Sequence, residues 1–254
     1  MIGSVKLSVV LITRNEADNI AACLESVAWA DELVVLDSGS SDETVAICKR
    51  YGARVEVSPD WPGFGPQKNR ALDLASGDWL LSIDADERVT PELRAEIERV
   101  LEAPDAEAYA MPRLSSYLGR PMRHGGWWPD HVTRLFRRGA ARFNEARVHE
   151  SLQVQGRTGR LRNHLVHYSF RNLGQVIAKM DAYSTYAADS MAERGRSAGL
   201  ASAVLHGLFA FLRTYVLRAG FLDGRLGFVL AVSNAEGAYY KYLKLAVRSG
   251  RLSR

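Results

Sequence analysis

The sequence predicts an α/β protein built on a doubly wound parallel sheet, and three observations indicate this. Short apolar runs alternate with amphipathic helical segments over the first hundred residues. The runs are β-branched and nearly continuous, as in strands that are covered on both faces. The chain has 254 residues, of which 47% are hydrophobic and 24% charged, so it can bury a sizeable core.

The expected elements follow one another in regular order. We predict strands over 7–13, 32–37, 54–58 and 79–83, and further strands over 109–113 and 131–137. Helices are expected from residue 17 to 27, over 44–51 and over 65–75. Another helix should begin at Thr90, because a threonine cap followed by Pro91 is a typical helix start.

The strand over 79–83 ends in two closely spaced carboxylates, Asp84 and Asp86, with Glu87 behind them. Such a pair at the mouth of a sheet suits Mg²⁺ or Mn²⁺, which uses one or two protein carboxylates and completes its shell with water and phosphates. A solvated acidic turn is the alternative. The basic helical segment before this strand and the capped helix after it favour the metal site.

Polar residues also follow the first two strands, and ligands in such sheets bind beyond the carboxyl ends of the strands. These residues are Thr13, Asn15, Glu16, Asp37 and Ser38. Asp37 could bind a ribose hydroxyl. Neither a Gly-x-Gly-x-x-Gly nor a Walker phosphate loop occurs, so we expect a nucleotide held by carboxylates and a metal. Lys68, with Arg70 nearby, could offset diphosphate charge or could lie on a solvated helix face.

Several ordered motifs resemble the inverting family-two glycosyltransferases of GT-A fold, over residues 5–101. They are Ser-Val-Val-Leu-Ile-Thr-Arg-Asn-Glu at 8–16, Val-Val-Leu-Asp-Ser-Gly-Ser-Ser-Asp-Glu-Thr at 34–44, Lys-Asn-Arg-Ala at 68–71, Ala-Ser-Gly-Asp-Trp at 75–79 and Asp-Ala-Asp-Glu at 84–87. Within the family, the chain looks most like the lipopolysaccharide-core glucosyltransferase branch. That resemblance depends on residues 127–137, 148–152, 164–170, 221–224 and 239–244.

The resemblance implies a Rossmann-like nucleotide-diphospho-sugar transferase sheet, with a nucleotide-sugar half over 1–105 and an acceptor half over 106–195. Asp86 would be the metal ligand and Asp84 would support the metal or the ribose. His167 would be a further metal ligand, since some enzymes of this fold close the site with a late histidine, or it is structural. Trp127 and Trp128 would stack on a sugar ring, or they close the edge of a core.

The catalytic base is the least defined part of the resemblance. Many family members supply it from a Glu-Asp or Thr-Glu-Asp sequence, and this chain has none. Inverting transfer needs a carboxylate that takes the proton of the acceptor hydroxyl. Glu150 is our first choice, with Asp130 and Glu145 in reserve. His149 either orients this group at the acceptor or is a polar strand residue.

Residues 196–254 are expected to form a basic amphipathic helical tail. They carry nine Lys or Arg against two acids, whereas residues 1–195 have a balance of −3. Apolar stripes run through 200–216 and 226–247, a pattern that suits a helix lying on an anionic bilayer. Packing on the catalytic domain and a homo-oligomer interface are the alternatives. No uninterrupted apolar run approaches the roughly 18 residues of a membrane span.

The sequence therefore predicts a metal-dependent transferase that moves a hexose, with glucose as the first choice, from a UDP-sugar to a lipid-linked acceptor. The expected acceptor is the inner core of lipopolysaccharide or lipooligosaccharide. Two cysteines and the lack of a signal-peptide pattern suggest a cytoplasmic protein, peripheral on the inner membrane face. Transfer to a polyprenyl phosphate and a non-catalytic sugar-nucleotide-binding protein remain alternatives. Nucleic acid is not an expected partner, because residues 1–195 are acidic on balance.

Overall fold

The computed structural model describes residues 5–144 and 151–252. The chain divides into two compact units, which we describe separately. Unit 1 contains Met1–Arg113 and Asp130–His167, and unit 2 contains Leu114–Pro129 and Tyr168–Arg254. This division differs from the three consecutive segments predicted above, because residues 114–129 and the helix after residue 172 group with the tail.

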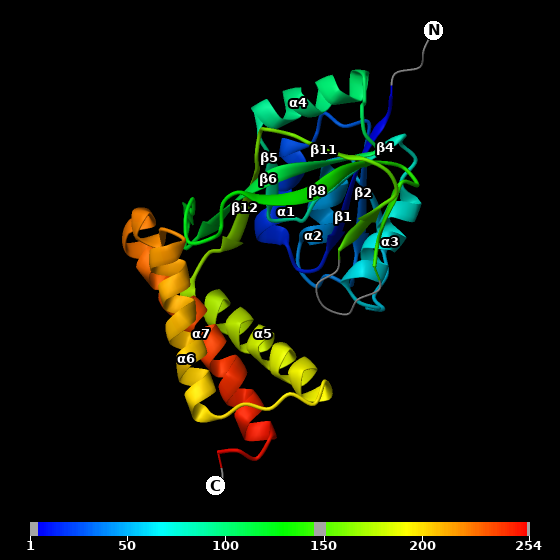
Figure 1. The fold of residues 1–254 in the computed structure, drawn as a ribbon. Helices are drawn as coiled ribbons and strands as arrows, with labels where there is room; N and C mark the ends of the chain where they lie inside the picture. The colour runs from blue at the N-terminus through cyan, green and yellow to red at the C-terminus, as the bar shows by residue number, and fades with distance from the viewer. Residues whose placement is uncertain (1–4, 145–150, 253–254) are drawn as a thin grey trace. The chain divides into compact units, whose positions relative to one another are not determined.

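The first half of the sheet in unit 1 is parallel, as predicted. The strands β1 (Leu7–Thr13), β2 (Glu32–Asp37), β3 (Arg54–Val57) and β4 (Trp79–Ser82) lie in the order β3-β2-β1-β4. All three of these pairings are parallel. The intervening helices are α1 (Ala17–Ser26), α2 (Thr44–Arg50) and α3 (Phe64–Leu74) (Figure 1). The carboxyl ends of β1, β2 and β4 thus meet at one edge.

The second half of the sheet is mixed, which the prediction of a parallel sheet did not include. Beyond β4 the order continues β8-β6-β12-β5, with β11 beside β6. The bounds are β5 (Glu87–Val89), β6 (Ala108–Tyr117), β8 (Asp130–Arg137), β11 (Thr158–Arg160) and β12 (Leu165–Phe170). The strand β8 is antiparallel to both β4 and β6, and β12 is antiparallel to β5. The chain passes from β6 to β8 without a helix. Antiparallel neighbours can be joined in this way, whereas parallel neighbours need a long crossover connection.

The core of unit 1 lies on both faces of this sheet. Val9 of β1 packs in one cluster with Ile20 of α1 and Ile97 of α4 (Pro91–Glu102). The next residue along β1, Val10, points to the opposite face and packs in a second cluster with Leu72 of α3. Because both faces are covered, the strand carries apolar residues at consecutive positions. A small hairpin of β9 (Ala141–Phe143) and β10 (Leu152–Val154) adjoins the second cluster.

The start of α4 confirms a sequence prediction. The Oγ1 atom of Thr90 accepts a hydrogen bond of 3.1 Å from the backbone N–H of Leu93, and Pro91 occupies the first turn. This helix follows β5 directly, so the cap fixes the chain just after the acidic turn.

Unit 2 contains the predicted helical tail and one helix more. Its helices are α5 (Leu173–Glu193), α6 (Leu200–Leu212), the π-helical turn η1 (Arg213–Leu217), the short η2 (Gly220–Asp223) and α7 (Gly224–Arg248). The helices α5 and α6 both lie against α7 (Figure 1). Val176 of α5 shares a core cluster with Leu230 of α7, and Ala188 shares another with Leu245. The strand β7 (Arg120–Pro121) pairs with the end of β6 in the same unit.

The helical segment Leu200–Leu217, formed by α6 and η1, is long and apolar enough by length and composition to cross a membrane. Its mean hydropathy is 1.5, and only 22% of it is buried. Unbroken apolar runs in this segment stop at His206 and Arg213, so the expectation of no membrane-length run holds only for uninterrupted stretches. Averaged over its 18 residues, the segment is apolar enough to span a bilayer.

Candidate active site

Asp37, at the end of β2, is the centre of a closed turn rather than an exposed ligand. Its side chain is buried, with 1% exposed. Its Oδ1 accepts hydrogen bonds from the backbone N–H groups of Gly39 (3.0 Å) and Ser40 (2.8 Å), and its Oδ2 accepts from the Thr13 hydroxyl (3.1 Å) and the Ser40 hydroxyl. A ribose hydroxyl bound here would have to replace one of these donors, so Asp37 and Thr13 shape the turn in this state.

The turn after β1 is tied to the turn after β2. Asn15 has a left-handed backbone with φ of 55°, its N–H donates to the Ser40 hydroxyl (2.8 Å), and its Oδ1 accepts from the Ser41 N–H (2.8 Å). Glu16 follows, and its carboxylate accepts a hydrogen bond of 2.7 Å from the Asn19 side chain. The structure therefore brings the predicted residues of these two strand ends together at one edge.

The Asp84 carboxylate pairs with two cationic side chains that come from distant parts of unit 1. Its Oδ1 lies 3.1 Å from Nζ of Lys68 on α3, and its Oδ2 lies 2.6 Å from Nη2 of Arg134 on β8. Burial alone would raise the pKa of Asp84, but the charges of Arg134 and Lys68 outweigh it and hold that pKa well below its usual range. Lys68 is itself buried, which contradicts the solvated helix face considered as an alternative.

Glu87, which contacts both Asp84 and Arg134, is completely buried. Its Oε1 accepts from Nη2 of Arg134 at 2.6 Å, and its Oε2 accepts from the backbone N–H of Asp84 at 2.9 Å. Burial would lower the pKa of Arg134, but Asp84 and Glu87 raise it further than burial lowers it. The guanidinium thus joins both carboxylates and stays charged.

Sequence reasoning missed Arg134 and its neighbour Arg113. Nη1 of Arg113 lies 3.5 Å from Glu87, while its Nε and Nη2 donate to Oδ2 of Asp130 at 3.0 and 2.6 Å. Asp130, the reserve catalytic base, is therefore held by a guanidinium. The available indication was an arginine in the middle of a predicted strand, which suggests a buried partner without saying which one.

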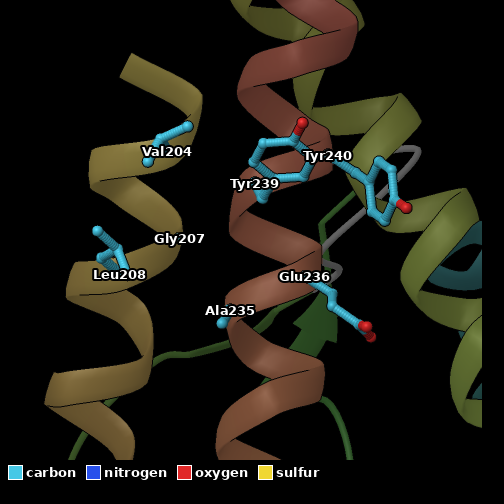
Figure 2. Close-up of a pocket in the computed structure, with 7 residues that line it drawn as sticks. All are labelled: Val204, Gly207, Leu208, Ala235, Glu236, Tyr239 and Tyr240. Carbon is cyan, nitrogen blue, oxygen red and sulfur yellow. The ribbon is translucent and has the colours of Figure 1, made fainter. Parts of the chain in front are cut away.

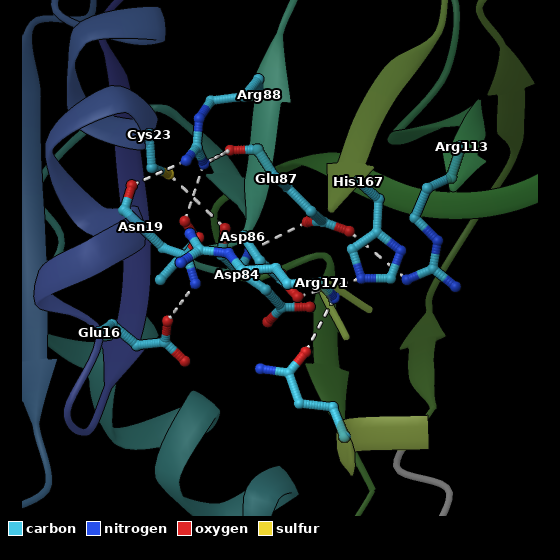
Figure 3. A network of polar contacts seen from close by, with 12 residues as sticks. Glu16, Asn19, Cys23, Asp84, Asp86, Glu87, Arg88, Arg113, His167 and Arg171 are labelled. Carbon is cyan, nitrogen blue, oxygen red and sulfur yellow. Dashed lines mark hydrogen bonds and ion pairs between the residues drawn. The ribbon is translucent and has the colours of Figure 1, made fainter. Parts of the chain in front are cut away.

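The acidic turn is also held from the side of α1. The Arg88 guanidinium donates to the backbone oxygens of Ala85 (2.8 Å), Glu87 (2.7 Å) and Asn19 (2.8 Å). The Cys23 thiol of α1 lies 3.6 Å from the backbone oxygen of Asp84, and burial raises the pKa of this thiol (Figure 3). The backbone of the acidic turn is consequently fixed by Arg88 and by contact with Cys23.

Asp86 and His167 lie next to each other, with 3.2 Å between Oδ2 and Nε2 (Figure 3). Asp86 belongs to the acidic turn, and His167 comes from β12, where it is paired with Glu87 of β5. Among residues 5–144 and 151–252, no group of three or more His, Cys, Asp and Glu side chains is arranged to hold a metal ion. A carboxylate with one imidazole nevertheless fits Mg²⁺ or Mn²⁺ when substrate phosphates and water supply the other ligands.

The remaining predicted site residues lie elsewhere. Glu145, His149 and Glu150 fall in 145–150, outside the described residues. Trp127 is partly buried and packs against a core cluster of unit 2, with its ring 5.7 Å from that of Tyr117 and perpendicular to it. Trp128 has the Arg123 guanidinium over its ring at 5.5 Å. The core position of Trp127 corresponds to the structural alternative considered for this pair, while its sugar-stacking role stays a prediction.

Comparison with known proteins agrees with this geometry. The model of the family "Glycosyl transferase family 2" matches residues 8–168. The lipopolysaccharide core biosynthesis glycosyltransferase LpsC of Rhizobium meliloti is 32% identical over 97% of this chain and 93% of its own length. An uncharacterized glycosyltransferase of Rickettsia felis is 30% identical, over 95% and 88% respectively.

A solved structure shares the fold over nearly the whole chain. The structure of S. aureus TarS residues 1–349 in complex with UDP has a TM-score of 0.52 at 16% identity and covers 98% of this chain and 92% of its own. The α/β sheet is thus like that of GT-A glycosyltransferases, as the resemblance implied. From the family match over residues 8–168, we conclude that the chain belongs to glycosyl transferase family 2 and is a glycosyltransferase.

Proposed function

We propose that this glycosyltransferase moves a hexose, with glucose as the first candidate, from a UDP-sugar to a lipid-linked oligosaccharide, with inversion at the anomeric carbon. The observation that carries this proposal is the pairing of Asp86 with His167 beside the Asp84–Lys68–Arg134 network at the carboxyl edge of the sheet. The similarity to LpsC, which is named for lipopolysaccharide core biosynthesis, supports a lipopolysaccharide core as the acceptor class.

In this proposal Asp86 and His167 would hold a divalent metal ion, Mn²⁺ or Mg²⁺. When bound, the ion would act as a Lewis acid and stabilise the leaving diphosphate. Asp84 is already bound to Lys68 and Arg134, so we assign it to positioning rather than to direct metal binding. Thr13, Asn15, Glu16, Asp37 and Ser38 would form the wall of the nucleoside site. The reaction would take place at the cytoplasmic face of the membrane, where the lipid-linked acceptor lies.

A panel of nucleotide sugars tests the donor assignment. A ligand that binds only the native state raises the melting temperature, and a concentration of 100 times its Kd stabilises by about 2.7 kcal/mol. We expect UDP-glucose with Mn²⁺ to raise the melting temperature more than UDP-glucose with EDTA. GDP-mannose and CMP-sialic acid, with and without Mn²⁺, are the controls. A larger shift with either control than with every UDP-sugar would contradict the proposal.

Glu150 is the proposed base, and its substitution separates two acceptor classes. A hydroxyl acceptor must lose a proton, so Glu150→Gln should slow transfer by about 10²–10⁴-fold. A polyprenyl phosphate is already ionised and needs no base. Transfer would be measured with lipopolysaccharide core and with polyprenyl phosphate as acceptors, using Glu98→Gln, at an exposed acid of α4, as the matched control. Unchanged turnover of Glu150→Gln with a phosphate acceptor would favour the polyprenyl alternative.

A further inference from the structure

The contact of α6 and η1 with α7 combines a small-residue face with a few rings. Ala203, Gly207, Ala210 and Thr214 form the small-residue face, and all four are buried. In a helix pair that packs in water, the large apolar residues normally face the partner and polar residues face the solvent. Here Phe211 and Tyr215 reach Phe228 of α7, but the aliphatic leucines of α6 are exposed.

This small-residue face lets the two helices approach closely. A Cβ atom on Gly207 would lie 3.2 Å from Cβ of Tyr239 and 3.3 Å from the backbone oxygen of Ala235. Figure 2 shows Gly207 of α6 opposite Ala235 and Tyr239 of α7. One polar bond crosses the pair, from Nδ2 of Asn234 to the Thr214 hydroxyl at 3.2 Å. Small contact residues and an interhelical polar bond are typical of helices that pack within lipid.

Many large apolar side chains of α6, η1 and η2 are exposed. Each of the following is at least half exposed: Leu200, Leu205, Leu208, Phe209, Leu212, Val216, Leu217, Phe221 and Leu222. We call these nine residues the outer apolar face. Leu205 is 64% exposed and Leu217 is 71% exposed, whereas the apolar core of unit 1 is nearly inaccessible. Such a concentration of exposed apolar side chains marks an interaction surface.

The charges around this face indicate what covers it. No Asp or Glu occurs between Glu193 and Asp223, and Arg213, Arg218 and Arg225 are exposed. One acid of α7, Glu236, lines the same surface hollow as Leu208. A second copy of the chain would bring like charges together, while an anionic lipid surface would complement them. The cations Lys241 and Lys244 contribute less than the sequence suggested. Lys244 is bound to Asp181, and burial together with the charge of Arg213 lowers the pKa of Lys241.

We infer that the outer apolar face inserts into the headgroup and acyl boundary of an anionic bilayer, with α6 lying along the surface. Apolar insertion, rather than the charge of α7, would supply most of the attachment, and the three exposed arginines would add preference for anionic lipid. The reason for membrane attachment rests on the proposed function, because a lipid-linked acceptor presents its sugars at the membrane surface.

Cosedimentation with vesicles tests the inference on the full chain. The vesicles would contain phosphatidylcholine alone or phosphatidylcholine mixed with phosphatidylglycerol. The test variant combines Leu205→Gln, Phe209→Gln and Leu212→Gln on α6. The control combines Leu173→Gln, Ile177→Gln and Tyr186→Gln on α5, which are also exposed apolar residues of unit 2. We expect the test variant to lose vesicle affinity by about a hundredfold, since three inserted side chains are removed. The control should bind like wild type.

Two further measurements separate the possible outcomes. Calorimetric titration with UDP and Mn²⁺ should give the same Kd for wild type and both variants, so vesicle binding and donor binding can fail independently. Sedimentation velocity without lipid reports self-association. Undiminished vesicle binding by the test variant would overturn the inference. The other contradicting outcome has two parts: wild type is a dimer while the test variant is a monomer, and neither binds vesicles. The outer apolar face would then be the contact with a second copy of the chain.

Discussion

Replacing Asp86 by alanine should abolish sugar transfer and the metal-dependent part of UDP-sugar binding. The Asp86 carboxylate lies 3.2 Å from the His167 imidazole, whereas Asp84 is bound by Arg134 and Lys68. Loss of a metal that stabilises a leaving diphosphate removes several kcal/mol of transition-state stabilisation, so turnover should fall about a thousandfold or more. Initial rates with UDP-glucose, and calorimetric titration of UDP with Mn²⁺ or EDTA, measure both effects.

The fold should survive this substitution, because Asp86 is partly exposed and its partner is an imidazole at 3.2 Å. Asp73→Ala is a suitable control, since Asp73 is an exposed acid of unit 1 paired with Arg142 on the surface. His167→Ala should reduce Mn²⁺ affinity in the same assay. Near-normal turnover of Asp86→Ala after the metal is stripped and restored would exclude Asp86 as a ligand.

Replacing Arg134 by alanine should destabilise unit 1 by about 3–5 kcal/mol, because it leaves the buried Glu87 and the neighbouring Asp84 without their shared cation. Arg134 donates to both carboxylates at 2.6 Å, and Glu87 is completely inaccessible to solvent. The Nε atom of Arg134 is buried without a hydrogen-bond partner among the described residues, so the two carboxylates must offset the desolvation of the guanidinium. Urea denaturation followed by tryptophan fluorescence measures the change, since Trp79 lies in the core of unit 1.

Arg94→Ala provides the comparison, because Arg94 forms an exposed pair with Glu98 one helical turn away, at 2.9 Å. Such a pair contributes about 0.3–0.5 kcal/mol. A second variant, Arg134→Lys, retains one positive charge and should recover part of the loss. If Arg134→Ala were no more destabilising than Arg94→Ala, the network beneath Asp84 would not be a determinant of stability.

The sequence predicted the parts of the fold that depend on local pattern. The strands of the parallel half, the cap at Thr90 and the placement of Asp84 and Asp86 after β4 all follow from hydrophobic runs and turn residues. These features are encoded within a dozen neighbouring residues, so they can be recognised without knowledge of distant contacts.

The contacts that complete the site could not be predicted this way. Arg134 reaches Asp84 from a strand fifty residues further along the chain, and His167 reaches Asp86 from the antiparallel β12. Spacing carries no information about such pairs, because the order of the later strands decides which side chains meet. The apolar stripes of the tail were visible in the sequence, but which stripe faces α7 depends on the packing of Gly207 against Tyr239.

The two buried thiols have a practical consequence for experiments on this protein. Cys23 and Cys48 are the only cysteines, both are inaccessible, and burial raises the pKa of Cys48 to about 11. A maleimide attacks the thiolate, so the folded chain should resist alkylation at neutral pH. Cys23 contacts the backbone oxygen of Asp84. The rate at which Cys23 is alkylated therefore reports how often the contact between α1 and the acidic turn opens. The native thiols would also leave an introduced surface cysteine as the sole target of a fluorescent dye.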